Sequence, residues 1–450
     1  DEAHNLPARA MTYYSPEITL QSLTDVNDHL QSLRIPKSVE KKGSAIHKQI
    51  TNYITDLITQ FPDAGAKKPV LKKFDKRFFR KILKEYDQFI LDYIQAVNYQ
   101  RGDQPGGKDK LIQFALNLRQ FSTILKESDS PEYSELLYLK EGKIKILCKS
   151  AAPKLEKQIA GFHSVIMQSA TLFPLDYFQK MLGYPPSAQK IQYNSPFPQQ
   201  NRLYQLKSNL STKYENRGES YDEIASTICN AVNVKNGNYL AFFPSFGYLS
   251  AVLREIEALS LSVELLVQGR KMSERKRKNL LKKLQDPNKK YLLLAVHGGI
   301  FSEGVDYTGD MAIGAFIIGP GLPAYSMEQD LMRKYFDFKW KKGFEYAYRN
   351  PGMMKVIQAG GRIFRTFTDR GFVMLIGHRF STPYYKNLLP TDWKIEQPPN
   401  LITRIQTFWT TQTKNIDLKK RSPEELSEKP KEMLKKYPKP VDLFDFMEKI

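Results

Sequence analysis

The sequence contains few cysteines and no long apolar run, and each absence excludes a large class of proteins. Its 450 residues include two cysteines, Cys148 and Cys229. Two are too few for a secreted disulfide framework, or for a four-cysteine zinc or iron–sulfur site built from this chain alone. No stretch approaches the roughly 18–20 consecutive apolar residues of a membrane-spanning helix. We therefore expect a reducing, cytoplasmic location and no membrane partner.

Acidic residues are also scarce relative to basic ones. The chain has 48 Asp plus Glu against 68 Lys plus Arg, a formal net charge of +20. This imbalance predicts a polyanionic partner, nucleic acid first and an anionic membrane second. A hydrophobic share of 41%, with 12% aromatic residues, can fill sizeable cores and excludes disorder over most of the chain. The length favours about three domains.

Residues 19–149 show helical periodicity and almost no strand-like runs. Within them, residues 67–84 carry nine basic residues against one acid. Steps of three and four would place these apolar residues on one helix face: Leu71, Phe74, Phe78, Ile82, Tyr86 and Phe89. This basic helix is either a solvated charged surface or a nucleic-acid contact. We expect a loop at 102–108, and a surface helix and tail from Arg421 onward.

Beyond residue 193, short apolar runs alternate with helical segments. The expected strands are 202–206, 239–243, 263–267, 291–296, 313–318 and 372–376. The expected helices include 221–234, 248–259 and 274–284. Short buried strands that alternate with helices predict a doubly wound α/β fold around a parallel sheet. A further buried strand is expected at 164–167.

Two short motifs lie in the first half. The opening letters DEAH contain an acid pair, which can hold Mg²⁺ through water and orient an attacking water. A pair of acids also occurs often by chance. Ser169 and Thr171, in the triplet SAT, follow the expected strand 164–167, and a helix cap explains them equally well.

Two further motifs follow in the second half. Residues 295–306 end a strand in a glycine turn that includes Gly304 and Asp306, at the sheet edge where α/β proteins bind ligands. A glycine-rich loop that only connects two elements, without binding a ligand, could have the same sequence pattern. In QAGGRIFR, Arg362 and Arg365 lie three apart on an expected helix, and such permanently charged donors suit the transfer of a phosphoryl group.

The order of these motifs is more specific than any one of them. DEAH, SAT, FSEGVD and QAGGRIFR follow one another as motifs II, III, V and VI do in superfamily-2 helicases, with FFPSF in the place of motif IV. The segments DEAHN, FFPSF and FSEGVDYTGD resemble the corresponding motifs of the XPD/DinG group of iron–sulfur DNA helicases. Within that group, the resemblance is strongest to XPD proteins of the archaeal type. In that group, a gap like the 164 residues between His4 and Ser169 holds an inserted helical domain, the Arch.

The resemblance implies an architecture. It consists of RecA-like, doubly wound motor domains of the P-loop NTPase type, with an inserted, mainly helical Arch domain. Residues 1–18 and 151–190 would belong to the first motor domain, and residues 19–150 would form the Arch-type insertion. Residues 191–450 would form the second motor domain with its C-terminal helices.

The resemblance also implies roles for individual residues. The catalytic set would be Asp1, Glu2, His4, Gln358, Arg362 and Arg365. The set that senses nucleotide and couples it to DNA would be Ser169, Thr171, Gly304 and Asp306. The candidates for DNA contact are Tyr214, Arg217, Ser245 and Phe246. Asp1 and Glu2 would hold Mg²⁺ through water, and Arg365 would be the arginine finger.

The sequence departs from the family pattern at three points. It has no Gly-x-x-x-x-Gly-Lys-Ser/Thr phosphate loop, and the four cluster cysteines are missing. Because the family carries both before its DEAH motif, we expect the phosphate loop and a 4Fe-4S cluster upstream of Asp1, and expect this chain alone to be inactive. Gly377 and His378 stand where relatives carry an acid, which we interpret as local variation. His297 is expected to be an ordinary loop residue.

The resulting expectation is an ATP-dependent 5′→3′ DNA helicase of the XPD type. It would use ATP and Mg²⁺, translocate on single-stranded DNA and unwind forked duplex as a monomer, with a role in nucleotide excision repair. We expect other DNA-repair proteins as its partners. We expect it to be associated with the nucleoid of an archaeal or bacterial cell. Two alternatives are a DinG-like helicase with nuclease or anti-phage duties and a nucleic-acid-binding helicase fragment without ATPase activity of its own.

Overall fold

The computed structural model describes residues 1–61, 68–101 and 109–411 of the chain. The chain forms two compact units, Asp1–Ile405 and Gln406–Ile450, and the residues of the site all belong to the first unit. The loop expected at 102–108 and the tail expected from Arg421 lie outside the described residues.

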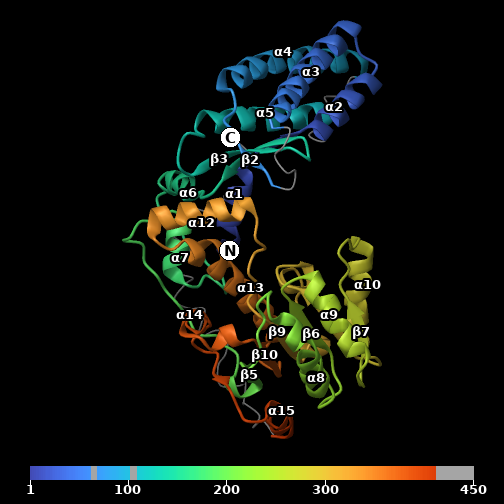
Figure 1. The fold of residues 1–450 in the computed structure, drawn as a ribbon, viewed down its shortest axis with the longest axis vertical. Coiled ribbons are helices and arrows are strands. Elements are labelled where there is room, and N and C mark those ends of the chain that lie inside the picture. The colour runs from blue at the N-terminus through green and yellow to red at the C-terminus, as the bar shows by residue number, and fades with distance from the viewer. Residues whose placement is uncertain (62–67, 102–108, 412–450) are drawn as a thin grey trace, which may run out of the picture. The chain divides into compact units, whose positions relative to one another are not determined.

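Four long helices of the first half lie side by side (Figure 1). They are α2 (Leu20–Ser32), α3 (Lys37–Thr59), α4 (Lys76–Arg101) and α5 (Lys110–Lys126). The predicted apolar face is confirmed for Ile82, Tyr86 and Phe89, which are buried. The predicted start is wrong: Leu71, which is 56% exposed, and Phe74 both precede α4. The carboxylate of Asp75 accepts hydrogen bonds from the backbone N–H groups of Arg77 and Phe78 and caps the helix there.

A four-stranded antiparallel sheet packs with these helices, although the sequence was expected to form almost no strands here. The strands lie in the order β1-β4-β3-β2 and span β1 (Glu17–Thr19), β2 (Val70–Leu71), β3 (Tyr133–Tyr138) and β4 (Lys143–Cys148). Between β3 and β4 the chain turns through Gly142, whose φ is +56°, a conformation that glycine adopts without strain. This hairpin signal was available in the sequence.

The strand predicted at 164–167 is absent from the structure. Ile166 is 87% exposed, and no described strand pairs with this segment. Within the segment, the carbonyl of Val165 accepts a hydrogen bond from the Tyr184 hydroxyl over 3.0 Å. Next to its end, the N–H of Ala3 donates to the carbonyl of Gln168 over 3.1 Å. An apolar run becomes a strand only when a neighbouring strand accepts its hydrogen bonds.

A seven-stranded parallel sheet forms most of the second half. Its order is β11-β5-β10-β9-β6-β8-β7, and every neighbouring pair is parallel. The strands are β5 (Arg202–Lys207), β6 (Tyr239–Phe243), β7 (Glu264–Val267), β8 (Tyr291–Val296), β9 (Gly314–Ile318), β10 (Gly371–Ile376) and β11 (Ile395–Glu396). All six predicted strands of this region are confirmed.

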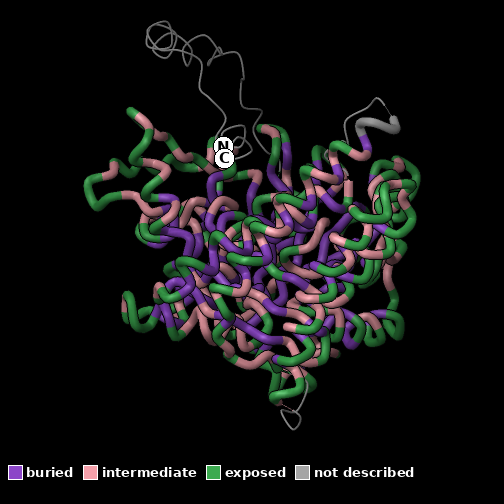
Figure 2. Tube along the Cα trace, turned by 90° about the horizontal axis from the view of Figure 1, so that it is seen from above, coloured by how far each residue is buried: buried purple, intermediate pink, exposed green. Residues whose placement is uncertain are grey.

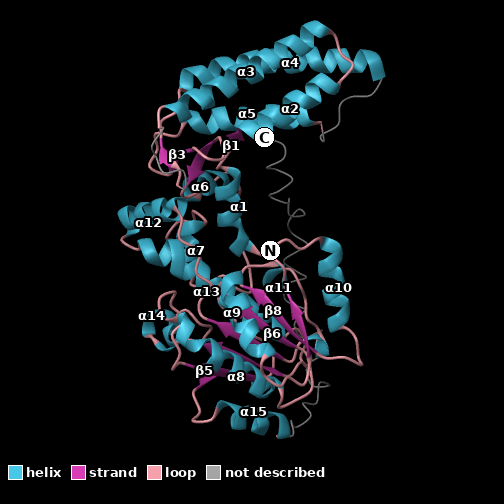
Figure 3. Ribbon diagram, turned by 45° about the vertical axis from the view of Figure 1, so that its right-hand side comes forward, coloured by secondary structure: helices cyan, strands magenta, loops and turns pink. Residues whose placement is uncertain are grey.

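Helices cover both faces of this sheet (Figure 3). On one face lie α8 (Tyr221–Val232) and α9 (Phe246–Glu257), and the ring centroids of Phe243 and Tyr248 are 6.2 Å apart there. Phe242 points to the opposite face, because neighbouring residues of a strand alternate. It joins a core with residues of α10 (Glu274–Leu284), α11 (Ile300–Glu303) and α13 (Asn350–Gly360). The doubly wound α/β fold is confirmed.

A second core joins distant parts of the chain. Its members include residues of α2 to α5 together with Tyr335 and Phe336 of α12 (Met327–Trp340), and the buried segments are drawn in purple in Figure 2. The remaining helices are α1 (Leu6–Tyr13), α6 (Ala152–Ile159), α7 (Leu175–Met181), α14 (Pro383–Lys386) and α15 (Leu401–Thr410). Among the described helices, none combines the length and the apolar composition of a membrane span.

His47 of α3 is buried in the helical part and titrates unusually. Its Nδ1 lies 3.3 Å from Asn27 Oδ1 and its Nε2 lies 3.2 Å from the Tyr86 hydroxyl. Burial among aromatic rings lowers the pKa of His47 to about 4, because the cationic imidazole loses its hydration.

We expect His47 to make the protein less stable in acid. The unfolded chain takes up a proton near pH 6.5 that the folded chain takes up only near pH 4, so stability falls as the pH falls between these values. The loss is roughly 3 kcal/mol. Unfolding of the His47→Gln variant, measured from pH 7 to pH 4, should show a pH dependence weaker by about that amount.

The exposed residue His163 supplies the control. His163→Gln should keep the pH dependence of the parent protein. Equal pH dependence for His47→Gln and the parent would contradict a buried neutral imidazole.

Candidate functional site

His4 lies at the centre of the predicted motifs. Its imidazole is buried, and Nδ1 lies 2.6 Å from the Ser169 hydroxyl while Nε2 lies 2.7 Å from Nε2 of Gln358. Ser169 in turn donates to Glu2 Oε2 over 3.2 Å and accepts the backbone N–H of Thr171 over 3.2 Å. Five predicted residues from motifs II, III and VI therefore share one cluster.

The hydrogen bonds fix the tautomer of His4. The Gln358 amide nitrogen can only donate, so His4 Nε2 accepts and the ring proton is on Nδ1. That proton points to Ser169, whose own hydroxyl points to Glu2. A relay of donors thus runs from Gln358 through His4 and Ser169 to the carboxylate of Glu2.

The electrostatics of the site keep His4 neutral. Burial lowers the pKa of the imidazole, the Glu2 carboxylate opposes that effect, and the guanidinium groups of Arg362 and Arg9 add to it. A neutral ring can accept from Gln358 and donate to Ser169 at the same time, whereas an imidazolium would donate on both sides. The relay therefore depends on the uncharged form.

The two acids of the opening motif are exposed. The Asp1 carboxylate accepts the backbone N–H of Glu2 over 2.9 Å, and Glu2 has a positive φ of 50°, an uncommon conformation outside glycine. Two carboxylates beside a hydroxyl are the oxygen donors that Mg²⁺ prefers, and Mg²⁺ usually completes its shell with water and substrate phosphates. Asp1 and Glu2 therefore fit the predicted role, although the described residues contain no group of three or more potential ligands.

The two arginines of QAGGRIFR lie next to Asp306. Asp306 Oδ1 is 3.3 Å from Arg362 Nη1 and 3.0 Å from Arg365 Nη2. Arg362 also donates to the carbonyls of Ser302 and Val305, both over 3.1 Å, and burial lowers the pKa of its guanidinium. Motifs V and VI are thereby joined by direct contacts.

The predicted helical placement of these arginines is wrong. Helix α13 ends at Gly360, Arg362 lies in the 3₁₀ turn Gly361–Ile363, and Arg365 follows it in irregular chain. Asp369 accepts the backbone N–H of Arg365 over 2.6 Å, which fixes the new chain direction. Two consecutive glycines favour the end of a helix.

One of the two glycines is required by packing. A Cβ on Gly360 would lie 2.4 Å from the indole of Trp393, whereas a Cβ on Gly361 would meet nothing within 4 Å. Packing therefore requires glycine at position 360 and does not require it at position 361. Gly304 lies exposed in the loop before Asp306.

The four candidates for DNA contact lie after β5 and β6. Tyr214 is 80% exposed, and the guanidinium of Arg217 lies 4.3 Å from its ring centroid. Phe246 is half-buried at the start of α9. Ser245 caps α9 by accepting the N–H of Tyr248 over 3.2 Å, so its hydroxyl already has a structural partner.

Gly377 is more than a local variation. Its φ is +135°, and its N–H donates to the carbonyl of Lys207 over 2.8 Å. A side chain in this conformation would be strained and would approach Thr212 to 3.0 Å. The following Arg379 donates to the carbonyl and hydroxyl oxygens of Thr212 over 3.2 and 3.3 Å, so this turn supports the loop that carries Tyr214.

His297 was expected to be an ordinary loop residue. Its Nε2 lies 3.3 Å from the carbonyl oxygen of Ile318, and burial lowers its pKa to about 4. Packing against β9 therefore accounts for the imidazole. The two cysteines are buried and unpaired, and burial raises the pKa of Cys148 to about 12 and that of Cys229 to about 11. Neither is a reactive thiolate at neutral pH.

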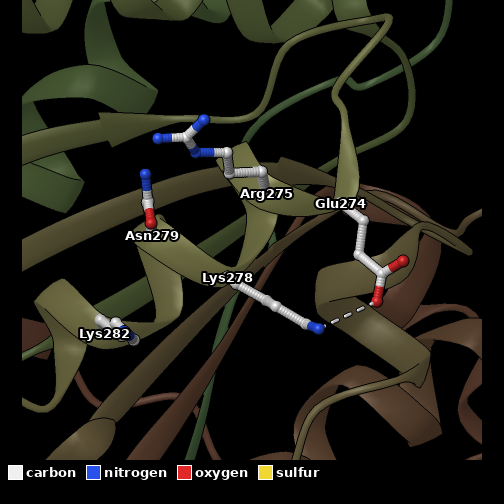
Figure 4. A pocket seen from close by; sticks show the side chains of 5 residues that line it. All are labelled: Glu274, Arg275, Lys278, Asn279 and Lys282. Carbon is white, nitrogen blue, oxygen red and sulfur yellow. Dashed lines mark ion pairs between the residues drawn. The ribbon is translucent and has the colours of Figure 1, made fainter.

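Some partners of the site could not be found from sequence motifs. No motif marks these partners, because they contribute either a backbone atom or a side chain that only the fold brings to the site. They are the carbonyls of Ser302 and Val305, the Asp369 carboxylate and the Arg9 guanidinium. A separate hollow in the surface is lined by residues of α10 (Figure 4). It shares no residue with the motif cluster.

Comparisons with known proteins show which families this chain resembles. Residues 228–396 match the family described as helicase C-terminal domain. ATP-dependent DNA helicase CHL1 of Kluyveromyces lactis is 23% identical over 427 residues, which cover 84% of this chain and 51% of that protein. The XPD helicase subunit of general transcription and DNA repair factor IIH from Dictyostelium discoideum is 23% identical over 276 residues, 56% of this chain and 35% of that protein.

A third relative is the 3′-5′ exonuclease DinG of Bacillus subtilis, 27% identical over 248 residues that cover 51% of this chain and 26% of the relative. The chain thus spans about half or less of the length of these curated relatives. Among solved structures, an apo XPD has a TM-score of 0.55 at 18% identity and covers 88% of this chain and 76% of its own. The Xpd4 protein of S. tokodaii has a TM-score of 0.55 at 16% identity, with 88% and 74% covered. These structures share the fold.

We expect the His4–Gln358 hydrogen bond to be measurable as a coupling energy. In a double-mutant cycle on unfolding with His4→Ala and Gln358→Ala, the two effects should fail to add by about 0.5–1.5 kcal/mol, the net value of one buried hydrogen bond. A parallel cycle with His4→Ala and Trp393→Phe, which do not share a partner, should be additive. Additivity of the first cycle would contradict the contact.

Proposed function

We propose that this chain, which belongs with the XPD-like superfamily-2 helicases, is the coupling part of an ATP-driven DNA helicase. The observation that carries the proposal is the relay from Gln358 through His4 and Ser169 to Glu2. It joins residues of three motifs that lie far apart in the sequence. A displacement of Gln358 therefore changes the hydrogen bonding of the carboxylate that would act on water.

The chemistry assigned to these residues is hydrolysis of a nucleoside triphosphate. Bound Mg²⁺ would offset the negative charge of the phosphates, and Asp1 and Glu2 would hold it through water. Glu2 would orient and deprotonate the attacking water. Arg365 would face the γ-phosphate and stabilise its developing charge, while Arg362, held by two backbone carbonyls, would stay in place as a positioning residue.

Asp306 would report whether nucleotide is present. Its carboxylate pairs with both arginines, and a triphosphate would compete for the same guanidinium groups. Release of Asp306 would free the loop that follows β8, which includes Gly304. Binding of nucleotide would in this way alter a loop at the sheet edge where ligands of α/β folds bind.

Single-stranded DNA would cross the ends of β5 and β6. Tyr214, stacked on Arg217, offers an exposed aromatic face for a base, and Phe246 lies at the start of the neighbouring helix. Stacking platforms combined with cations bind single strands with little sequence preference. A net charge of +20 makes such binding sensitive to salt.

The wider role follows from the family resemblance. We propose 5′→3′ translocation and unwinding of forked duplex in DNA repair, with nucleotide excision repair first. The relative whose printed name includes DNA repair factor IIH supports the proposed role in DNA repair. The match to DinG favours a DinG-like helicase as the second candidate.

We expect Arg365 to be essential for hydrolysis. The assay uses the full-length protein that contains this sequence. Arg365→Gln should lower the rate of ATP hydrolysis about a thousandfold or more, because the transition-state charge loses its planar donor. Arg404→Gln, which removes an arginine paired with Glu396 beside β11, is the matched control and should retain the rate. A loss below tenfold for Arg365→Gln would refute the finger role.

We expect Tyr214 to stack on a base. Tyr214→Ala should weaken binding of an oligothymidine by about 1–3 kcal/mol, measured as fluorescence anisotropy at fixed salt. Tyr325→Ala, which removes another exposed tyrosine, should leave the affinity unchanged. Equal affinity for Tyr214→Ala and the parent chain would exclude Tyr214 from the strand path.

A further inference from the structure

Helix α10 and its flanking turns carry a strong excess of positive charge. Residues 270–290 contain ten Lys and Arg against two acids, Glu274 and Asp286. None of the sequence motifs includes this segment, and the proposed hydrolysis does not use it. The excess is therefore unexplained by the site described above.

The fold directs this charge outward. Leu280, Leu281 and Leu284 of α10 pack against the core of the parallel sheet. Arg275, Asn279 and Lys282, at spacings of four and three, lie on the opposite side of the helix. Figure 4 shows these side chains along the hollow that they line together with Glu274 and Lys278.

Little of the charge is neutralised within the protein. Lys278 pairs with Glu274 over 3.4 Å, and Lys289 pairs with Glu264 over 2.7 Å. In the part of the chain that the structure describes, Arg275, Lys276, Lys282 and Lys283 have no carboxylate within ion-pair distance. Exposed cations that repel one another along a rigid helix gain most from an external polyanion.

This basic face continues into the proposed strand path. The guanidinium of Arg270, three residues before the helix cap Ser273, lies 5.5 Å from the ring centroid of Phe246. DNA that contacts Phe246 would therefore meet Arg270 and then α10. Continuity of this kind favours nucleic acid over an acidic protein or an anionic membrane.

The composition of the face distinguishes duplex from single-stranded DNA. Residues 269–290 contain no aromatic residue, so α10 offers cations and an amide but no stacking platform. Single-strand sites combine both kinds of side chain, as Tyr214 and Arg217 do. Contacts to phosphates alone suit a duplex, whose bases are stacked inside and whose charges follow at about 1.7 Å along the axis. An 11-residue helix spans about 16 Å, enough to contact several phosphates.

We propose that the outward face of α10, centred on Arg275, Lys278, Asn279 and Lys282, binds the phosphate backbone of a duplex DNA arm next to the single-strand path. The inference goes beyond the proposed hydrolysis but rests on the proposed binding of DNA. According to this proposal, the double-stranded arm of a forked substrate binds to α10, at the β7 edge of the sheet. Each lysine removed from this face takes away one phosphate contact.

The test compares two double variants of this chain that lose the same charge. K278Q/K282Q removes two lysines of the α10 face. K386Q/K394Q removes two exposed lysines, one at the end of α14 and one directly before β11, the edge strand opposite β7. Binding of a blunt duplex and of an oligothymidine is measured across a salt series. K278Q/K282Q should bind the duplex at least about tenfold more weakly at 0.1 M salt, with a salt slope reduced by about 1.8.

The same variant should bind oligothymidine within about twofold of the parent chain, which also shows that it is folded, and K386Q/K394Q should match the parent on both substrates. Unchanged duplex affinity in K278Q/K282Q, or an equal loss in K386Q/K394Q, would overturn the inference. A duplex affinity that is unchanged while binding to phosphatidylserine vesicles is lost would overturn it in favour of a membrane. Failure of the parent chain to bind oligothymidine would instead contradict the proposed function.

Discussion

A single buried imidazole holds the site together. His4 contacts a hydroxyl 165 positions away and an amide 354 positions away in the sequence, and it can serve both only in its neutral form. Burial supplies that condition by lowering its pKa. The proposed coupling depends on the neutral form of His4. A charged ring could not accept a hydrogen bond from Gln358, and the relay to Glu2 would be broken.

The packing of α12 keeps these distant segments together. Tyr335 and Phe336 belong to the same core as the helices of the first half, and the Tyr335 hydroxyl donates to Glu132 over 2.9 Å. Lys145 of β4 lies 2.8 Å from Glu328 at the start of α12, and the Tyr138 hydroxyl donates to the same carboxylate. These contacts tie the antiparallel sheet to the polypeptide that continues into α13, so that Gln358 reaches His4.

Sequence reasoning found the parallel sheet because its strands are buried on both faces and read as continuous apolar runs. The prediction of strands failed where a strand depends on a neighbouring strand that pairs with it. The segment 164–167 is apolar enough for a strand, yet no described strand accepts its hydrogen bonds. The hairpin of β3 and β4 was overlooked among helices, although Gly142 marked its turn.

The candidate site divides in the same way. Motif order brought His4, Ser169 and Gln358 into one hypothesis, and the structure brings their side chains together. Helical spacing gave the wrong backbone for Arg362 and Arg365, since two glycines end α13 before them. The carbonyl partners of Arg362 could not be foreseen, because every residue has a carbonyl and only the fold selects which ones meet the guanidinium.

The central claim is that one set of contacts links a nucleotide site to a DNA path. The decisive measurement is the rate of ATP hydrolysis of the full-length protein with and without single-stranded DNA, at low and high salt. We expect the rate to rise on addition of DNA at low salt and to lose this increase at high salt, where DNA dissociates. A rate that is the same with and without bound DNA would contradict it.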